Sequence, residues 1–338
     1  MTKLEAPAMR DQASHPIEGG YLHALAASPA AITPTSAPVQ KPIIKTVEPL
    51  DIADACTSRP PALDFVLPGI LAGSVCGDVS PGGIGKSMLA LQKSLLVAGV
   101  DTLGGAFGTP TVGKTTILAL EDPPIILQHR IFNIFRAATG ADQPGWSPKN
   151  KISPTTWAEN CRIIPLLGTG FKVDDASGHD RVCRYSDGQR LVIVDTLRRC
   201  HSQEENDNGS MAEVLGIFEK AAKATGATFL LLHHVPKPSG TGGPAVTARG
   251  ASAITDNMRY LAIMRSLTQD ELEKLVIDPS ERWMHVIYEP IKNNYCPPSG
   301  PLWFCKGPGG VLEYQGKLNE SLDIAATTPR KRKKGKYD

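Results

Sequence analysis

The sequence predicts an α/β fold in which a mostly parallel central sheet is flanked by helices and extended by antiparallel strands at its carboxyl-terminal end. A glycine-rich segment at residues 80–87 lies between a short strand pattern and an amphipathic helix pattern. Three later apolar runs have the length of buried strands, and helical patterns occur between them. The last part of the chain contains three short β-type runs, WMHVIY, PLWFCK and GVLEY, separated by Gly and Pro. These runs are typical of antiparallel strands added to a parallel core.

The two ends of the 338-residue chain differ in composition from its middle. Residues 1–48 are rich in Ala, Pro, Ser and Thr, which cannot bury enough apolar surface to offset chain ordering. We therefore expect a disordered extension at 1–48, one ATPase-type domain at 49–320 and a basic disordered tail at 321–338. The net charge is +2, and the basic residues concentrate in the sequence RKRKKGK near the end. This tail can contact nucleic acid electrostatically or only solubilise the chain end, and the sequence favours neither.

Neither membrane insertion nor export is expected from the sequence. No run of about eighteen apolar residues occurs, and the first residues lack the apolar centre of a secretory signal. The seven cysteines are scattered without a Cys-x-x-Cys pair, which argues against a disulfide framework and against a zinc site. We therefore expect a soluble, cytoplasmic protein with reduced thiols.

Two segments match the phosphate-binding P-loop pattern, and their context distinguishes them. GTPTVGKT, residues 108–115, fits G-x-x-x-x-G-K-[ST] in full, whereas SPGGIGKS, residues 80–87, has Ser in place of the first Gly. A P-loop must join a strand to a helix, so that backbone N–H groups and the helix N-terminus surround the phosphates. A strand-like run, TTILALED, follows Lys114, whereas the helix pattern SMLALQKSLLVAG follows Lys86. The imperfect match is therefore the predicted ATP site, with ligands at Pro81, Gly82, Gly83, Ile84, Gly85, Lys86, Ser87 and Met88.

ATP hydrolysis also needs a Mg²⁺ ligand and a group that positions the attacking water. The strand RLVIVDT ends in Asp195, at the sheet edge where nucleotides bind in α/β folds. We expect Asp195 and Ser87 to lie on the metal side of the site. Glu121 ends the strand TTILALED and is the candidate that polarises water, whereas Asp122 is expected to cap the helix that begins after it.

A third strand, ATFLLLHH, ends in a histidine pair that follows a predicted helix at residues 211–225. The spacing of Ser210 and Glu213 predicts a capping box for this helix. His234 at the strand tip is either a sensor of the γ-phosphate or a surface histidine, and spacing alone leaves both open.

The segments VSPGGIGKSMLALQ, LALEDPP, LVIVDTLRRCHSQEEN, LLLHHVPK and ARGASAITDNMRY, taken in this order, resemble the RepA-type hexameric replicative helicases of broad-host-range IncQ-like plasmids. The resemblance covers roughly residues 62–315 and includes the Ser at the first P-loop position. It implies a RecA-like P-loop NTPase core, a homo-hexameric ring, ATP and Mg²⁺ as cofactors, and movement along single-stranded DNA. A primase or an origin-binding initiator is a candidate partner. The chain departs from the family in its amino-terminal extension, in the polar strand before the P-loop and in an insert around residues 177–189.

The resemblance assigns roles to individual residues. Lys86 and Ser87 match the phosphate and magnesium positions, Glu121 the catalytic acid, and Asp195 the second carboxylate on the metal side. His234 matches the histidine thought to couple the nucleotide state to DNA. Arg259 matches an arginine that reaches the γ-phosphate of the neighbouring subunit, and Arg249 is a rival for that role.

Three segments are candidates for DNA contact. Residues 236–252 follow His234, are rich in Gly and Pro, and contain Lys237 and Arg249, as expected of a loop in the channel of a ring. Residues 198–210 begin basic and become acidic, so a solvated loop is the simplest interpretation. Lys292 to Tyr295 form a basic, amide and aromatic set, for which we favour a structural strand end.

Two classes of function remain from the sequence. The first is an ATP-dependent DNA helicase that acts in plasmid replication. The second is a regulatory ATP-binding protein that uses nucleotide as an assembly switch and unwinds nothing. A DNA-binding repressor fits poorly, because the sequence shows no helix-turn-helix pattern.

Overall fold

The computed structural model describes residues 48–140, 154–235 and 251–327, and the chain divides at Pro60 into two compact units. In the first unit, helix α1 (Ile52–Thr57) is capped by the side chain of Asp51, which accepts from the backbone N–H of Asp54. Most of the expected tails, 1–47 and 328–338, lie outside the described residues. The expectation of a disordered tail from residue 321 is wrong for 321–327, because helix α9 (Leu318–Thr327) covers them.

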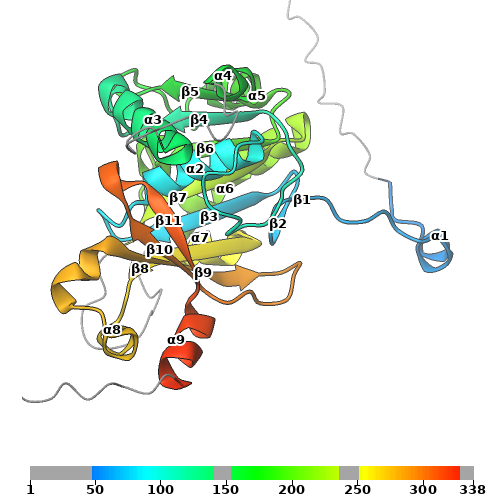
Figure 1. The fold of residues 1–338 in the computed structure, drawn as a ribbon. Coiled ribbons are helices and arrows are strands. Elements are labelled where there is room, and N and C mark those ends of the chain that lie inside the picture. Colours follow the sequence, from blue (N-terminus) through cyan, green and yellow to red (C-terminus); the bar gives the residue numbers. More distant parts are fainter. Residues whose placement is uncertain (1–47, 141–153, 236–250, 328–338) are drawn as a thin grey trace, which may run out of the picture. The chain divides into compact units, whose positions relative to one another are not determined.

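The second unit is built on a large sheet, which has nine strands within the described residues (Figure 1). The strand order is β11-β10-β9-β8-β3-β7-β6-β4-β5. The six strands from β8 to β5 are parallel, and β9, β10 and β11 are antiparallel additions to the β8 edge. The predicted fold class is therefore confirmed. The strands are β3 (Val75–Ser80), β4 (Thr115–Ala119), β5 (Cys161–Pro165), β6 (Leu191–Asp195), β7 (Thr228–His234), β8 (Tyr260–Ser266), β9 (His285–Asn293), β10 (Leu302–Lys306) and β11 (Leu312–Lys317).

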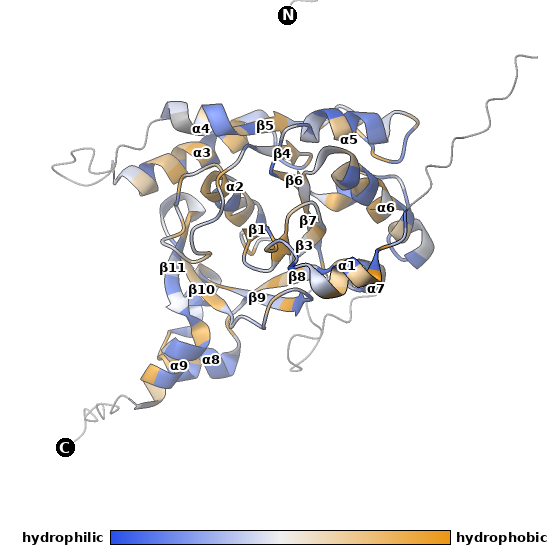
Figure 2. Cartoon of the chain, turned by 90° about the vertical axis from the view of Figure 1, so that its right-hand side faces the viewer, coloured by the Kyte–Doolittle hydropathy of each residue, from blue (hydrophilic) through white to orange (hydrophobic). Residues whose placement is uncertain are grey.

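Helices cover both faces of the parallel part of the sheet, because its strands are apolar on both sides. In β6, Leu191 and Ile193 belong to one core cluster, and Val192 and Val194 belong to the other. The first cluster contains residues of α2 (Lys86–Val97), α3 (Pro124–Thr139) and α4 (Pro154–Asn160). The second contains residues of α5 (Gly178–Ser186), α6 (Asn208–Thr225) and α7 (Ala251–Asn257). In Figure 2, helices such as α5 and α6 carry hydrophobic residues on one side and hydrophilic residues on the other.

Smaller elements complete the second unit. They are the hairpin β1 (Phe65–Leu67) and β2 (Ile70–Leu71), the helix α8 (Gln269–Leu275), and the 3-10 turns η1 (Leu197–Arg199), η2 (Pro279–Met284) and η3 (Pro308–Gly310). Leu272 of α8 and Leu318 of α9 form a third, small cluster with Ile287 of β9. No helix in the described parts of the chain has both the length and the apolar content that crossing a membrane requires.

Two predicted helix starts are wrong, and both errors concern capping. Helix α6 begins earlier than expected, and its N-cap is Asp207, whose carboxylate accepts from the backbone N–H of Ser210 at 2.8 Å. The capping box expected at Ser210 therefore does not form. Asp122 does not cap α3 either, because it forms an ion pair with Arg130 at 2.8 Å and the N-cap position is Pro123.

A buried ion pair connects the P-loop strand to the P-loop helix. Lys93 of α2 and Asp78 of β3 are 0 % and 1 % exposed, and Lys93 Nζ lies 2.6 Å from Asp78 Oδ2. The hydroxyl of Tyr288 on β9 donates to Asp78 Oδ1 at 3.0 Å and shares a 2.9 Å hydrogen bond with Tyr260 of β8. The ammonium also lies 4.0 Å from the centre of the Tyr288 ring. Asp78 of the polar strand that precedes the P-loop is thus matched by partners from two other elements, α2 and β9.

We expect Lys93→Ala to lower the free energy of unfolding by about 3 to 5 kcal/mol, because Asp78 would be left as a buried, unpaired charge. Chemical denaturation followed by circular dichroism measures this loss. Lys274→Ala is the control, since it breaks an exposed pair with Asp270 and should cost less than about 1 kcal/mol. Equal losses in the two variants would contradict the importance assigned to the buried pair.

Candidate nucleotide-binding site

The segment between β3 and α2 has the local geometry of a phosphate-binding loop. Gly83 and Gly85 adopt φ values of 81° and 116°, a region that favours glycine. Helix α2 begins directly after this turn, at Lys86, so its first N–H groups point toward the loop. A Cβ atom added at Gly82 or Gly83 would have no atom within 4 Å, so this side of the loop is open. The loop therefore has room for a polyphosphate beside the helix N-terminus.

Lys86 projects from the start of α2 into the site and is only 4 % exposed. Its ammonium donates to the backbone carbonyl of His233 on β7 at 2.8 Å. Burial lowers the pKa of Lys86 to about 8, although the nearby carboxylates of Asp195 and Glu121 oppose this shift. Lys86 is thus a cation at neutral pH, and the added negative charge of a phosphate would stabilise it further.

Asp195, the last residue of β6, lies beside Ser87 at the bottom of the site. It is 5 % exposed, its side chain is hydrogen-bonded to Ser87, and its Oδ1 has no hydrogen-bond partner in the described parts of the chain. Burial raises the pKa of this carboxyl, whereas the hydrogen bond from Ser87 and the charge of Lys86 lower it. A buried carboxylate oxygen without a partner is an available ligand for a cation.

Glu121 and His234 meet at the tips of β4 and β7. His234 Nε2 lies 3.3 Å from Glu121 Oε2, and the two side chains are 42 % and 38 % exposed. His234 pairs in register with Ser80, which ends β3 and begins the loop. The acidic candidate and the histidine candidate therefore contact each other at the rim of the site.

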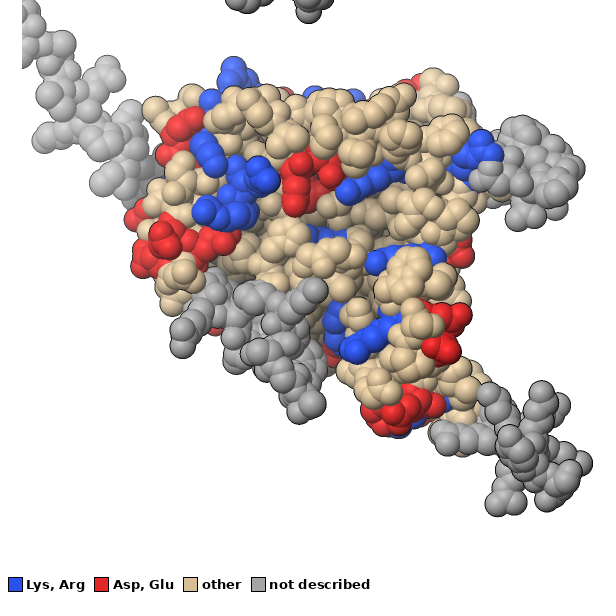
Figure 3. All heavy atoms as spheres, turned by 90° about the vertical axis from the view of Figure 1, so that its left-hand side faces the viewer, with Lys and Arg blue, Asp and Glu red and all other residues tan. Residues whose placement is uncertain are grey.

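These side chains surround one cavity of about 360 Å³. Its lining includes Lys86, Glu121, His234 and every predicted loop ligand except Gly82. The cavity is also lined by residues that no sequence pattern predicted: Arg130 of α3, Lys306 of β10, and Gly309 and Gly310 of η3. Figure 3 shows the face toward which the parallel strands point, and basic and acidic side chains gather close together on it.

The donor set fits a magnesium ion bound together with a nucleotide. Mg²⁺ prefers hard oxygen ligands and is usually held by one or two carboxylates plus substrate phosphates. Ser87 and Asp195 provide a hydroxyl and a carboxylate beside the loop, and Asp195 Oδ1 is unpaired as described above. No cluster of three or more His, Cys, Asp or Glu side chains suited to a metal occurs in the described ranges. Ser87 and Asp195 would hold Mg²⁺ together with phosphate oxygens.

The second P-loop match lies at the opposite edge of the sheet. Lys114 is exposed and is followed directly by β4, so the helix that a P-loop requires does not follow it. Arg259 is also exposed and precedes β8, whose Leu261 pairs with Gly77 at the amino-terminal half of β3. The structure therefore does not bring Arg259 to the cavity of its own chain. Arg249 and Lys237 lie outside the described residues, as do residues 236–250 of the predicted DNA-binding loop.

The two remaining candidate segments have structural contacts. Lys292 on β9 donates to the backbone carbonyls of Thr255 and Asp256, at 2.6 and 3.1 Å, which agrees with the structural role favoured for this strand end. In the segment 198–210, Arg198 lies 3.6 Å from Glu205.

A group of buried histidines lies directly behind the cavity. His233 is 6 % exposed and its Nδ1 lies 3.6 Å from Glu205 Oε1, while His201 is fully buried. Burial lowers the pKa of His233 to about 4, with further contributions from the positive charges of its neighbours, Lys86, His234, His201 and Arg198. His233 is therefore neutral at pH 7.

We expect the unfolding free energy to fall as the pH is lowered from about 7 to 4. An unfolded histidine takes up a proton near pH 6.5, whereas folded His233 does so only near pH 4, so the unfolded state binds more protons in this window. His233 alone can account for at most about 3 kcal/mol of the fall. Denaturation at several pH values should show a shallower slope for His233→Asn and an unchanged slope for His129→Asn, whose side chain is exposed. Identical slopes for wild type and His233→Asn would contradict the assignment.

The chain is similar to known proteins in structure and in sequence. Among solved structures, the chain is similar to the RadB recombinase, with 14 % identity over 72 % of this chain and 90 % of that chain, and a TM-score of 0.45. A family model described as an AAA domain matches residues 44–240, which is more than half of the chain and includes the loop, Glu121, Asp195 and His234. The chain therefore belongs to the AAA domain family of ATPases.

Proposed function

We propose that this chain is an ATP hydrolase that acts as a subunit of a DNA helicase in plasmid replication. The observation that carries the proposal is that Lys86, Ser87 and Glu121 line one cavity and Asp195 is hydrogen-bonded to Ser87 beside it, although these residues come from two strand ends and one helix start. A cation, a hydroxyl and two carboxylates in this arrangement match the needs of phosphoryl transfer to water.

In the proposed reaction, the β- and γ-phosphates of ATP lie along the loop and the ammonium of Lys86 compensates their charge. Ser87 and Asp195 would hold Mg²⁺, which supplies positive charge to the phosphate oxygens. Glu121 accepts a proton from the attacking water as the water oxygen bonds to the γ-phosphorus. The bond from the γ-phosphorus to the bridging oxygen breaks, and ADP leaves with that oxygen.

The helicase part of the proposal rests on the resemblance described above and on the contact between Glu121 and His234. His234 ends β7, and the chain then continues into the glycine-rich and proline-rich segment expected to contact DNA. A change at Glu121 when the γ-phosphate leaves would alter the 3.3 Å contact with His234. We propose that this contact passes the nucleotide state to the DNA-binding segment of a homo-hexameric ring.

We expect wild-type protein to hydrolyse ATP faster when single-stranded DNA is present and to displace a strand from a forked duplex. Lys86→Ala should lower the ATPase rate at least about 100-fold, because it removes the cation at the transferred phosphate. Lys114→Ala is the matched control, since it alters the other P-loop match and should retain both activities. Colorimetric phosphate release and gel-based strand displacement measure the two activities.

Each outcome of that experiment separates the candidate functions. Hydrolysis that DNA does not stimulate, with no strand displacement, would favour the regulatory switch over the helicase. Loss of activity in Lys114→Ala with normal activity in Lys86→Ala would place the nucleotide at the wrong edge of the sheet and end the proposal.

We propose further that Arg259 reaches the γ-phosphate bound to a neighbouring subunit, because the resemblance assigns it this role and it is exposed and does not line the cavity of its own chain. Arg259→Ala should lower the ATPase rate about 10³-fold or more while nucleotide binding survives. Arg282→Ala, at another exposed arginine, is the control. Light scattering identifies a protein concentration at which the Arg259→Ala variant assembles. A normal ATPase rate of this variant at that concentration would show that the assignment is wrong.

A further inference from the structure

The hairpin formed by β10 and β11 supplies part of the wall of the nucleotide cavity. Lys306, Gly309 and Gly310, from the end of β10 and the turn η3, line the cavity with the P-loop. In the sequence, these residues lie more than 200 positions after the P-loop SPGGIGKS. The part of the chain that extends the sheet therefore also takes part in the site.

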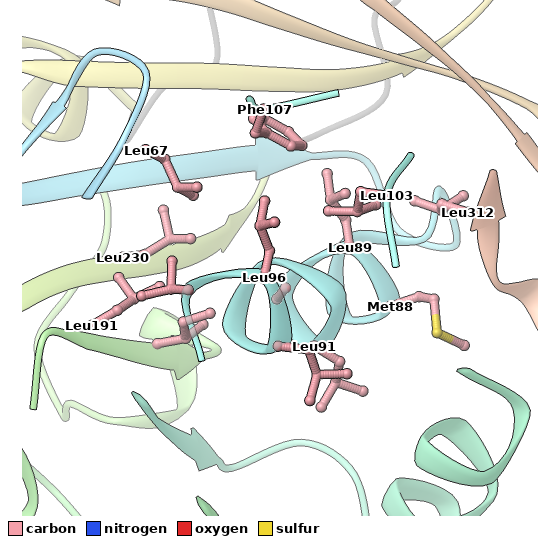
Figure 4. Packing of buried hydrophobic residues seen from close by; sticks show 14 of the residues in the cluster. Leu67, Met88, Leu89, Leu91, Leu96, Leu103, Phe107, Leu191, Leu230 and Leu312 are labelled. Carbon is pink, nitrogen blue, oxygen red and sulfur yellow. The ribbon is translucent and has the colours of Figure 1, made fainter. Parts of the chain in front are cut away.

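Hydrogen bonds fix the hairpin to the P-loop helix. Gln92 of α2 is fully buried, its amide nitrogen donates to the carbonyl of Leu312, and its amide oxygen accepts from the N–H of the same residue, both at 3.0 Å. The side chain of Leu312 packs into the core beside Leu89 and Leu103 (Figure 4). Gln92 lies in α2, the helix that begins at the end of the P-loop. The hydrogen bonds of Gln92 therefore fix the position of the hairpin relative to the loop.

The turn of the hairpin is also fitted to α3. Gly309 adopts a φ of 66°, and a Cβ atom there would clash with the side-chain amide of Asn133. A side chain at this position would push the turn away from α3, which carries Arg130 at the same cavity. The glycine therefore permits the close approach that brings the end of β10 over the loop.

Lys306 extends from this hairpin to the P-loop itself. Its Nζ donates to the backbone carbonyl of Gly83 at 3.1 Å, and its Cε lies 3.7 Å from the position of a Cβ atom on Gly85. Burial lowers the pKa of Lys306. No carboxylate within the described ranges forms an ion pair with it, so its charge is balanced only by a carbonyl dipole.

We propose that Lys306 is a second phosphate-binding lysine, which the carboxyl-terminal hairpin brings to the P-loop of its own chain. Its ligand is a nucleoside di- or triphosphate, and the proposal rests on the proposed function of the cavity as an ATP site. A partly buried ammonium without a carboxylate partner in the described ranges, in the lining of the same cavity as Lys86, gains most from an anionic group bound in that cavity.

The test measures the dissociation constant of fluorescent ATP and ADP analogues for the full-length chain. Lys306→Gln retains a donor for the Gly83 carbonyl but removes the charge, and it should raise both constants about 10-fold to 100-fold. Lys306→Arg should stay within about 3-fold of wild type, because it keeps the charge. Lys317→Gln is the control, since Lys317 ends the same hairpin, is 55 % exposed and pairs with Glu320.

A second readout separates phosphate binding from support of the loop. The ATP affinity of wild type should weaken more steeply with salt concentration than that of Lys306→Gln, because one cation fewer contacts the phosphates. Wild-type affinity and salt dependence in Lys306→Gln would overturn the proposal while the ATP site stands. If Lys306→Gln fails to fold, as seen by circular dichroism, Lys306→Arg and the wild-type salt dependence decide. An absence of ATP binding in wild type would instead refute the proposed function.

Discussion

The buried pair between Lys93 and Asp78 is the interaction on which the geometry of the nucleotide site depends. The P-loop can hold phosphates only if the strand before it and the helix after it keep a fixed relation, and this pair joins the two at 2.6 Å. Tyr288 extends the connection to β9, so the antiparallel strands are fixed to the same point. Gln92 precedes Lys93 in the same helix, and its amide oxygen accepts a hydrogen bond from the N–H of Leu312 on β11. The loop is therefore held between a parallel and an antiparallel part of one sheet.

The parallel strands determine which side chains can meet. Because β4, β6, β3 and β7 point the same way, their carboxyl ends form one edge, and a polar residue at each end contributes to the same site. Lys86 follows β3 and donates to the carbonyl of His233 near the end of the neighbouring strand β7, so it connects two strand ends at this edge. Residues at the amino ends, such as Lys114 and Arg259, are excluded from the site by the same geometry. A role for Arg259 in hydrolysis therefore requires a second copy of the chain.

Local pattern was sufficient to predict the parallel core and the strand and helix on either side of the glycine-rich loop. The run that ends in Asp195 is continuously apolar, and the segment after Lys86 has apolar residues at helical spacing. Both have clear ends, so they are recognised as a buried strand and an amphipathic helix of an α/β fold. Lys306 could not be predicted, because its contact with Gly83 depends on how a late hairpin folds back over the sheet. The capping errors at Asp122 and Ser210 have a similar cause. Asp122 has Arg130 as a stronger partner two helical turns away, and Asp207 is a better N-cap for α6.

Several of the buried polar atoms that lack partners in the described parts of the chain belong to residues close to Lys86 and to the cavity. Asp195 Oδ1, both ring nitrogens of His201 and Nδ1 of His233 are buried without hydrogen-bond partners in the described parts of the chain. Such an atom costs about 1 to 3 kcal/mol when it is left unpaired, whereas the buried side chains of Gln92 and Lys93 in the same unit have hydrogen-bond partners. The apolar strands β6 and β7 offset this cost, since their central residues are completely buried. The stability of the sheet therefore allows the site to keep charged and polar groups oriented before a ligand arrives, which is the condition for electrostatic stabilisation of a transferring phosphate.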